Sequence, residues 1–585
     1  MMKKLFWVIG LAMAFASCVN QDYDLSEEID LNISVGGNLG LPSSSTNIYT
    51  LDQIFELDTS SCIKPVGKNY GLSEGDYVLV QDGTPVSSSI EIPLQNISVP
   101  SSTEATAVIP FEVPSGGGNV LVDIPNMFTK ISISDNNINR AIVSLTNVKT
   151  NIPLDIKLSA SSQEAGGSVS FNSGFSFILP EACTVKMADN VTGSQFRIDG
   201  NKVIFNEPVL LNINSFVSIP IIITGIDMTR LPQNQGIYAP GCLFFEQEIS
   251  YRGPISINAS GLSAGDNSSI KLAIKPIAST ASITAITGKI NPEINISPSS
   301  FSIDDIPDFL KEPDNNLDVE NPQIYLTVAN SSECELNING CLTAIDENGN
   351  ITKVWLGNEH NTAPIKVLPH CDTPNGVTRI CLSRTGRGDN SADFYVAVPE
   401  LSSLIATIPN TIKLENIDIK VNQEHDVTFE LGRYDFNIDC KVVVPLAFGS
   451  SLEFTYTTDD TGWNEDLYKY SFKKVVATVT VSNTVPLNMI PEVKALNNQG
   501  LEINDVEASV EGFVAAGTLD APKESNLVIT ITSTTNNIGN LDGVRFIFKA
   551  TSGANAAGVP LNMNQALQFT NISLKLVGGV GIDLE

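Results

Sequence analysis

One short pattern occurs three times in this sequence: NIPLDI at Asn151–Ile156, ECELNI at Glu333–Ile338 and TVPLNM at Thr484–Met489. Before each copy, apolar and polar residues alternate in a segment that ends in asparagine, at Asn147, Asn330 and Asn483. Alternation with a period of two is typical of a strand with one buried face. Asparagine tolerates left-handed backbone and bonds to its own chain, so we expect it to end each strand.

A glycine follows each copy at a constant distance. Gly167, Gly349 and Gly500 each lie 14 residues after the residue that precedes the shared leucine. They stand in polar stretches (QEAGG, DENGN and NNQG) that are typical of tight turns with positive φ. Each copy therefore predicts a strand, an asparagine loop, a strand, a glycine turn and a further strand. The copies are 182 and 151 residues apart, which is too long for a solenoid and suits separate or fused sandwich domains.

Length and composition favour an all-β protein of several domains. The 585 residues suffice for about three to four domains. Gly, Pro, Ser, Thr, Asn and β-branched residues are frequent, so we expect tandem Ig-like or β-sandwich domains. One short helix is expected at Leu51–Phe55. The expected division is a signal peptide at 1–17, a lipid tether at 18–30, an N-terminal β region at 31–118, and three β-sandwich units at 119–290, 291–440 and 441–585.

The charge balance is strongly acidic. The chain has 34 Lys and Arg against 65 Asp and Glu, a net charge of −31. Such a surface repels phosphate backbones, so we expect no nucleic-acid partner. The charges are dispersed and 42% of the residues are apolar, which distinguishes the chain from a disordered acidic tail.

The N-terminus predicts export. Lys3 and Lys4 precede an apolar run from Leu5 to Phe15, and small residues then lead to Cys18. This is the pattern of a secretory signal peptide, and the apolar run is too short for a permanent membrane span. The sequence FASC is similar to a bacterial lipobox, which implies that Cys18 becomes the lipidated first residue. The alternative is an ordinary secreted protein in which Cys18 is incidental.

Several further segments carry a resemblance to a known group. They are YDL after the cysteine, IPDFLKEPDNNLDVENPQIYLTVAN, VVVPLAFG and PLNMIPEVKALNNQG. The chain resembles uncharacterised Bacteroidota lipoproteins over most of its mature length, and no catalytic motif accompanies the likeness. The acidic stretch VNQDYDLSEEID is similar to the surface-export signal of such lipoproteins, which implies the outer face of the outer membrane; the periplasmic face is the alternative. The repeated pattern is also loosely similar to late-embryogenesis-abundant (water-stress) sandwich domains, a likeness of fold only.

The sequence offers no credible catalytic context. Two G-x-S-x-G segments, at Gly71–Gly75 and Gly261–Gly265, lack the preceding strand and following helix of a hydrolase, so both predict turns. The three histidines, His360, His370 and His425, show no zinc-ligand spacing. We therefore expect no enzyme activity, no cofactor and no metal site.

Eight cysteines besides Cys18 leave two interpretations open. Pairs Cys334–Cys341 and Cys371–Cys381 could form disulfides across hairpins in an exported protein. Free buried thiols are the alternative, because a domain with a large hydrophobic core is stable without disulfide bonds.

Ligand-binding candidates are few. Trp463, Tyr456 and Tyr468 belong to the one dense aromatic group and form a candidate glycan platform, with an aromatic core as the alternative reading. Trp355 stands apart from this group. The tripeptide Arg387–Asp389 spells RGD, but such triplets arise easily in polar glycine-rich loops.

These observations predict a non-enzymatic cell-envelope lipoprotein, anchored to the membrane by its N-terminal lipid and exposed on the cell surface, with an interaction or structural role. One alternative is a glycan-binding accessory lipoprotein of a nutrient-uptake system. Another is an adhesin or fimbria-type component. The glycan or protein partner is not identified by the sequence.

Overall fold

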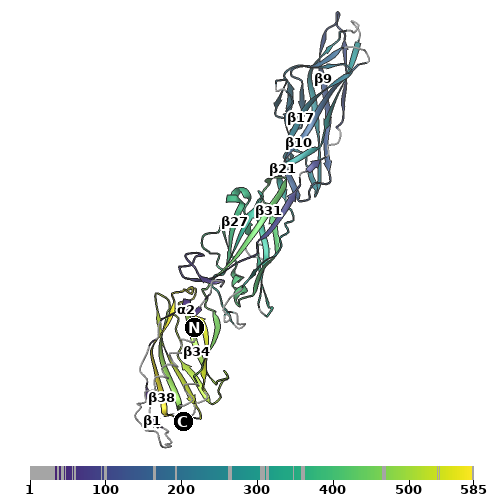
Figure 1. The fold of residues 1–585 in the computed structure, drawn as a ribbon. Helices are drawn as coiled ribbons and strands as arrows, with labels where there is room; N and C mark the ends of the chain where they lie inside the picture. Colours follow the sequence, from purple (N-terminus) through teal and green to yellow (C-terminus); the bar gives the residue numbers. More distant parts are fainter. Residues whose placement is uncertain are drawn as a thin grey trace.

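The computed structural model describes these residues: 33–35, 39–40, 45, 48–55, 57, 61–93, 95–97, 102–162, 167–191, 194–260, 267–303, 310, 315–346, 348–357, 363–463, 470–535, 538 and 541–582. Most of them are in strands and few are in helices, which confirms the all-β prediction. The strands pair into six sheets among the described residues. Three sections, each a sandwich of two sheets, follow one another along a rod (Figure 1).

The first section is drawn in blue and teal at the top of Figure 1. One sheet has the order β13 (Cys183–Met187), β17 (Ser215–Asp227), β10 (Ile142–Ser161), β20 (Asn267–Ala278) and β8 (Ala105–Glu112), and is extended by β21 (Ala281–Ile290), β7 (Gln95–Ile97) and β30 (Val427–Glu430). The other has the order β14 (Phe196–Asp199), β15 (Lys202–Phe205), β12 (Ser176–Ile178), β19 (Cys242–Asn258), β11 (Ser168–Phe171) and β16 (Val209–Asn212), with β9 (Asn119–Asp135) and β18 (Gly236–Ala239) also on β19.

The middle section holds a smaller and a larger sheet. The smaller has the order β22 (Ser299–Ser302), β29 (Thr411–Val421), β24 (Leu336–Ile345) and β25 (Ile351–Leu356), with β26 (Ile365–Val367) on β24. The larger has the order β28 (Phe394–Ala397), β27 (Val377–Ser383), β23 (Gln323–Asn330), β31 (Gly432–Pro445), β5 (Tyr77–Asp82) and β4 (Ile63–Pro65), with β6 (Val86–Ile92) on β31.

The end section contains the first and the last strands that the structure describes. Its larger sheet has the order β1 (Ile33–Val35), β38 (Ala566–Ile582), β33 (Tyr470–Asn483), β36 (Lys523–Ser533) and β35 (Val506–Glu511), with β2 (Leu39–Gly40) and β3 (Tyr49–Thr50) on β38. Its smaller sheet has the order β32 (Glu453–Thr461), β37 (Gly543–Ser552) and β34 (Leu487–Leu496). The short helix α2 (Leu51–Phe55) lies where the sequence predicts it.

The chain runs along the rod and returns. It starts in the end section (β1–β3), passes through the middle section (β4–β6) and builds most of the first section (β7–β21). It returns through the middle section (β22–β31), visiting the first section once more for β30, and finishes in the end section (β32–β38). The strands of residues 31–118 are thereby shared among all three sections.

The described hydrophobic core is continuous through the first and middle sections. One cluster of buried side chains reaches from Ile109 and Phe177 in the first section to Leu336 and Val442 in the middle section. Only the edge of the end section that faces the middle section joins this cluster. The rest of the end section has its own clusters, one of them around Phe472.

The repeated pattern is confirmed in two of its three copies. Strand β23 ends at Asn330 and strand β33 ends at Asn483, as predicted. The prediction is wrong at Asn147, because β10 continues through this exposed residue as one strand of 20 residues. Strands β17 and β21 pair with β10 on its two sides at this residue, and shifts in their register with β10 accommodate the local irregularity. Strand β20 pairs with the second half of β10.

All three glycine turns have the predicted backbone. The φ angles of Gly167, Gly349 and Gly500 are 109°, 79° and 75°. In two of the turns one side chain organises the loop in the same way. The Oδ1 atom of Asp346 accepts hydrogen bonds from the backbone N–H groups of residues 348 and 350, and Oδ1 of Asn497 accepts them from 499 and 501.

Candidate functional sites at the junctions between sections

The asparagine at the end of β23 forms a buried corner. Asn330 is 1% exposed, and its Nδ2 donates to the carbonyl oxygens of Cys334 at 2.9 Å and Leu368 at 3.0 Å. Its Oδ1 accepts from the backbone N–H of Ser332 at 2.9 Å and from the Ser332 hydroxyl at 2.7 Å. One amide thus satisfies four backbone or side-chain groups where the chain leaves one sheet for the other.

Asn483 forms the same corner at the end of β33. It is 0% exposed, its Nδ2 donates to the carbonyl oxygens of Leu487 at 3.2 Å and Ala515 at 2.8 Å, and its Oδ1 accepts from the N–H of Val485 at 2.7 Å. In both corners the asparagine Nδ2 donates to the backbone carbonyl four residues after the asparagine, and its Oδ1 accepts from the backbone N–H two residues after it. The two corners therefore share one hydrogen-bond pattern.

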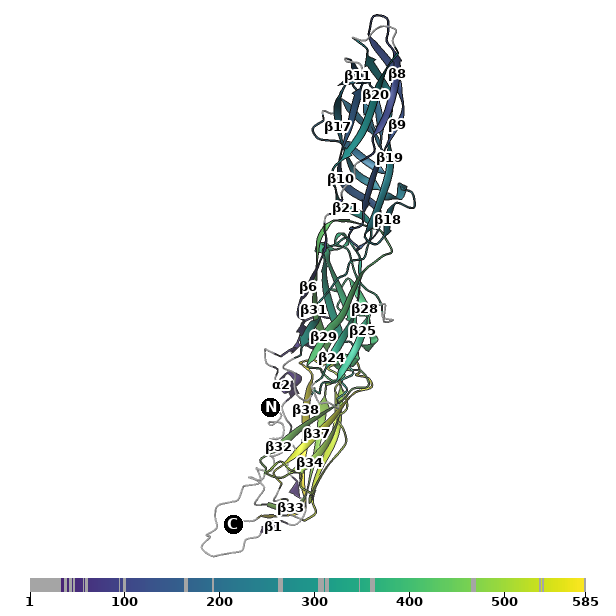
Figure 2. The ribbon, with the colours of Figure 1, turned by 90° about the vertical axis from the view of Figure 1, so that its right-hand side faces the viewer.

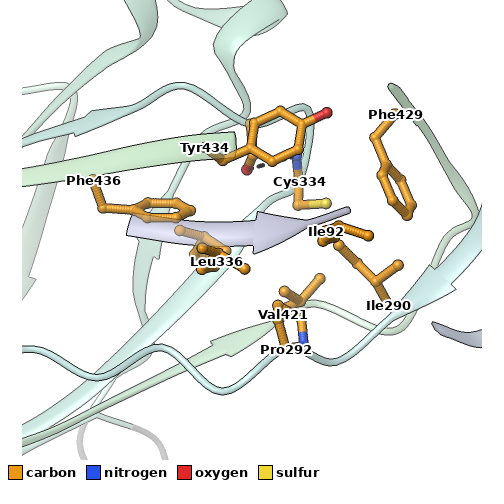
Figure 3. A pocket seen from close by; sticks show the side chains of 11 residues that line it. Ile92, Ile290, Pro292, Cys334, Leu336, Val421, Phe429, Tyr434 and Phe436 are labelled. Carbon is orange, nitrogen blue, oxygen red and sulfur yellow. Dashed lines mark hydrogen bonds between the residues drawn. The ribbon is translucent and has the colours of Figure 1, made fainter. Parts of the chain in front are cut away.

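Each corner lies near a junction between sections. Val485 and Leu487, which follow Asn483, belong to the core that the end section shares with the middle section. Ser332 and Cys334, which follow Asn330, line a small pocket together with residues of the first section and of the crossing strands. The complete lining is Ile90, Ile92, Ile290, Pro292, Ser332, Cys334, Leu336, Val421, Phe429, Tyr434 and Phe436. Figure 3 shows how these side chains surround the space. The pocket volume is about 10 Å³, roughly the space of a single water molecule.

The pocket chemistry favours packing over reaction. Burial raises the pKa of Cys334 to about 11, with the Ser332 hydroxyl opposing this and Glu333 adding to it. Burial also raises the pKa of Tyr434, whose hydroxyl donates to the carbonyl of Glu430. Both groups stay protonated at neutral pH, so the thiol is not an activated nucleophile.

The junction between the middle and end sections is polar and buried. Asp76 and Asn562 are 6% and 5% exposed. Nδ2 of Asn562 donates to Oδ1 of Asp76 at 2.9 Å and to the carbonyl of Glu74 at 3.0 Å, while the N–H of Ser73 donates to Oδ2 of Asp76 at 2.7 Å. Asp76 and Asn562 are 486 residues apart in the sequence. Neither residue stands in a recognisable motif, so the sequence alone gives no signal of this network.

The predicted aromatic platform faces the core where the structure describes it. Trp463 is half-buried, packs against the core around Phe472, and donates its indole N–H to Oδ2 of Asp460 at 3.3 Å. Tyr456 is half-buried on β32, directly opposite Phe548. Tyr468 lies outside the described residues. The glycan platform stays a prediction.

The remaining candidates fall in turns and loops. Gly71–Gly75 forms a turn before β5, as predicted, whereas 261–265 lies outside the described residues. His370 and His425 are exposed, and His360 lies outside the described part of the chain. In the RGD segment, burial opposes ionisation of Asp389, but hydrogen bonds from Ser391 hold its pKa below the ordinary value.

None of the eight cysteines after Cys18, all of which the structure describes, forms a disulfide. Within the described ranges no three His, Cys, Asp or Glu side chains group as metal ligands. The described residues contain no helix that is long and apolar enough to cross a membrane. The predicted signal peptide, the tether and Cys18 lie outside the described residues.

Comparisons with known proteins give no family. No protein-family model matches the chain, and no curated protein matches it. One similar solved structure is a "putative secreted protein" from Parabacteroides distasonis, with 15% identity and a TM-score of 0.36 over 49% of this chain and 83% of that one. Another is from Sulfolobus turreted icosahedral virus, with 11% identity and a TM-score of 0.10 over 83% and 91% of the two chains. At these TM-scores the likenesses carry no argument about function.

Proposed function

We propose that this protein is a non-enzymatic cell-envelope lipoprotein that acts as a rigid spacer on the cell surface. In this proposal Cys18 carries the lipid, the end section lies next to the membrane, and the first section is held away from it. The observation that supports it most is the place of β1. This strand pairs with the last part of β38, at the end of the rod opposite the first section (Figure 2).

The length of the tether fits this orientation. Ile33, the first residue of β1, follows Cys18 by 15 residues. An extended chain spans at most about 3.5 Å per residue, so this tether reaches roughly 50 Å. The lipid would therefore keep the β1 end of the rod near the bilayer, with the turn between β8 and β9 at the far end.

The packing of the sections supports a stiff rod. Strand β21 of the first section pairs with β30, which arrives from the middle section, and Phe429 of β30 is buried in the shared core. Backbone bonds join the end section to the middle section, including Tyr77 N–H to the Leu561 carbonyl and Leu561 N–H to the Leu446 carbonyl, both near 2.7–2.8 Å. Such contacts at both junctions favour a spacer over freely jointed domains.

Membrane attachment is tested by substitution of the predicted lipid cysteine. We expect Cys18→Ala to move the protein from the membrane fraction to the soluble fraction and to abolish incorporation of a labelled fatty acid. Membrane association that survives this change would contradict the proposed anchor.

Orientation is tested by energy transfer to a dye in the bilayer. Ser115 lies in the exposed turn between β8 and β9, and Gln499 lies in the exposed turn after β34, near the β1 end. A donor dye on Ser115→Cys should show little transfer to an acceptor lipid, and the same dye on Gln499→Cys should show strong transfer. Both are made with Cys371→Ser, which removes an exposed thiol. Equal transfer from the two positions would overturn the upright spacer.

Cell-surface exposure is tested by protease treatment of intact cells. We expect fragments from the first section to be released while the outer membrane is intact. Cleavage only after the outer membrane is opened would place the protein on the periplasmic face.

A further inference from the structure

The outer face of the smaller sheet in the middle section carries an exposed tryptophan. Trp355 lies on β25, and 39% of its surface is exposed. It is directly opposite Cys341 on β24, and Cys341 is directly opposite Glu415 on β29. Residues that oppose each other in antiparallel strands point to the same face. Trp355, Cys341 and Glu415 therefore form one row across three strands that lie side by side in Figure 2.

A cationic and an anionic side chain lie close to the row that contains Trp355. In the neighbouring row, Lys353 on β25 is directly opposite Thr343 on β24. Oε1 of Glu415 accepts from the Thr343 hydroxyl at 2.7 Å and lies 3.7 Å from Nζ of Lys353. Both members of this ion pair are partly exposed to solvent. Lys353 is two residues from Trp355 on the same strand, and Glu415 is two strands away in the row of Trp355, so a ligand that extends across these strands would find a cationic donor and a carboxylate acceptor.

A buried amide next to the row lacks one partner. Asn339 is 3% exposed, and among the described residues no donor reaches its Oδ1. It lies under Gly357, where an added Cβ would come within 2.1 Å of that oxygen, and Gly357 has a φ of +95°. An unsatisfied buried acceptor is rare in folded proteins. Because this oxygen is enclosed beneath Gly357, a buried water is a donor of the right size for it, and a ligand on the sheet surface does not reach it.

We propose that Trp355, Lys353 and Glu415 form a binding site for a neutral carbohydrate. The apolar face of a pyranose ring stacks on the indole, and its hydroxyl rim bonds to the charged pair. A sugar is favoured over a protein partner because, among the described residues of β25, the exposed large apolar side chains are Trp355 and Ile351, one on each side of Lys353. Stable protein interfaces need a much larger area, on the order of 800 Å² per partner.

Trp463 provides the matched control. Its indole N–H is already bonded to Asp460 and its ring packs on the core. Trp355 and Trp463 are the two tryptophans that follow the predicted signal peptide. The proposal does not depend on the lipid anchor or on the spacer role.

The experiment is affinity electrophoresis of the full chain in gels that contain one neutral polysaccharide each: starch, mixed-linkage β-glucan, galactomannan, xylan, or the neutral O-glycan fraction of mucin. We expect one of these to retard the wild-type protein. Trp355→Ala should weaken this binding roughly tenfold or more, and Trp355→Phe by less, because stacking is partly kept. Trp463→Phe should bind like the wild type.

Fluorescence separates the two rings independently. In the Trp463→Phe protein the emission of Trp355 should shift when the retarding polysaccharide is added, and the Trp355→Phe protein should show no shift. Retention of binding in Trp355→Ala, or no retardation of the folded wild type by any of these polysaccharides, would overturn the proposal. Thermal unfolding of each variant verifies that the fold is unchanged.

Discussion

The two junctions of the rod are built differently. At the junction of the first and middle sections, β21 pairs with the visiting strand β30 and an apolar core continues across. The described chain crosses this junction four times, between β6 and β7, β21 and β22, β29 and β30, and β30 and β31. At the junction of the middle and end sections the chain crosses twice, and a buried polar network around Asp76 and Asn562 joins the sides.

This difference sets the expected unfolding units. Burial of apolar surface is the main stabilising term in folding, and it is shared between the first and middle sections. The end section has a separate core, and only its upper edge, with Val485, Leu487 and Leu561, joins the larger one. We therefore expect the first and middle sections to unfold as one cooperative body and the end section to unfold on its own.

The largest effect is expected from Phe429→Ala. Phe429 is 2% exposed and lies in the crossing strand β30. Loss of its ring should destabilise the joint unfolding of the first and middle sections by about 3–5 kcal/mol, as large-to-small changes in cores do. Calorimetry with hydrogen exchange assigns each transition to its section.

Phe472→Ala is the matched control, because Phe472 is buried in the separate core of the end section. It should lower only the transition of the end section. If Phe429→Ala leaves the first section unaffected, the shared unfolding unit is disproved.

A smaller effect is expected at the two asparagine corners. Asn330→Ala and Asn483→Ala each leave several buried backbone groups without partners and should cost about 2–3 kcal/mol. Asn147→Ala, at the exposed asparagine of the first copy, should change stability by less than about 0.5 kcal/mol. Denaturant titration of the three variants measures this. A large loss in Asn147→Ala would show that the first copy also depends on its asparagine.

Asn562→Ala should weaken the polar junction by about 1–2 kcal/mol, because the carboxylate of Asp76 loses a buried donor. Small-angle X-ray scattering should then show a wider range of angles between the end section and the rest of the rod. Asn564→Ala changes an exposed neighbour and serves as the control. An unchanged scattering profile in Asn562→Ala would mean that other contacts fix this angle.

Alkaline pH should distinguish the sections with the smallest effect. Burial raises the pKa of Cys183 and Cys440 to about 12 from an ordinary 9.0. Above pH 9 the unfolded chain releases these thiol protons while the folded chain keeps them, so stability falls as pH rises from 9 toward 12. Residues 441–585 contain no cysteine, so the end section lacks this contribution.

The measurement is the melting temperature of each section between pH 8 and pH 11. Cys440→Ala should flatten the decline of the first and middle sections, even if it lowers their stability at pH 8. If the melting temperature declines with the same slope in the wild type and in Cys440→Ala, thiol ionisation is not the cause of the decline.

Local features of the fold could be predicted from the sequence. The strand ends at Asn330 and Asn483 and the positive φ at Gly349 depend on short-range chemistry that a few residues determine. The continuation of β10 through Asn147 could not be predicted in this way, because two partner strands from distant parts of the sequence, β17 and β21, pair with β10 at this residue. The order of the sections was hidden for the same reason, since β5 pairs with a strand that follows it by more than 300 residues.

The candidate sites were harder to predict. Density of aromatic residues pointed to Trp463, but the fold turns that ring to the core and leaves the isolated Trp355 exposed on an outer sheet face. Whether a side chain on a strand is buried depends on which face of the sheet is covered by other strands. The spacing of aromatic residues in the sequence does not show this. The pair Asp76 and Asn562 carries no sequence signal, because its partners meet only when the two ends of the chain come together.

The out-and-back path of the chain has a consequence for synthesis. A chain that emerges from its N-terminus completes the first section before the middle section, and the middle section before the end section. Strands β1, β2 and β3 pair with β38, which is made last. The earliest strands must therefore wait, unpaired, until almost the whole chain has emerged, and these long-range pairings are slow to form. The strands that are made first thus join a sheet that is completed last. A chain truncated before residue 566 lacks β38, and β1, β2 and β3 then have no strand to pair with.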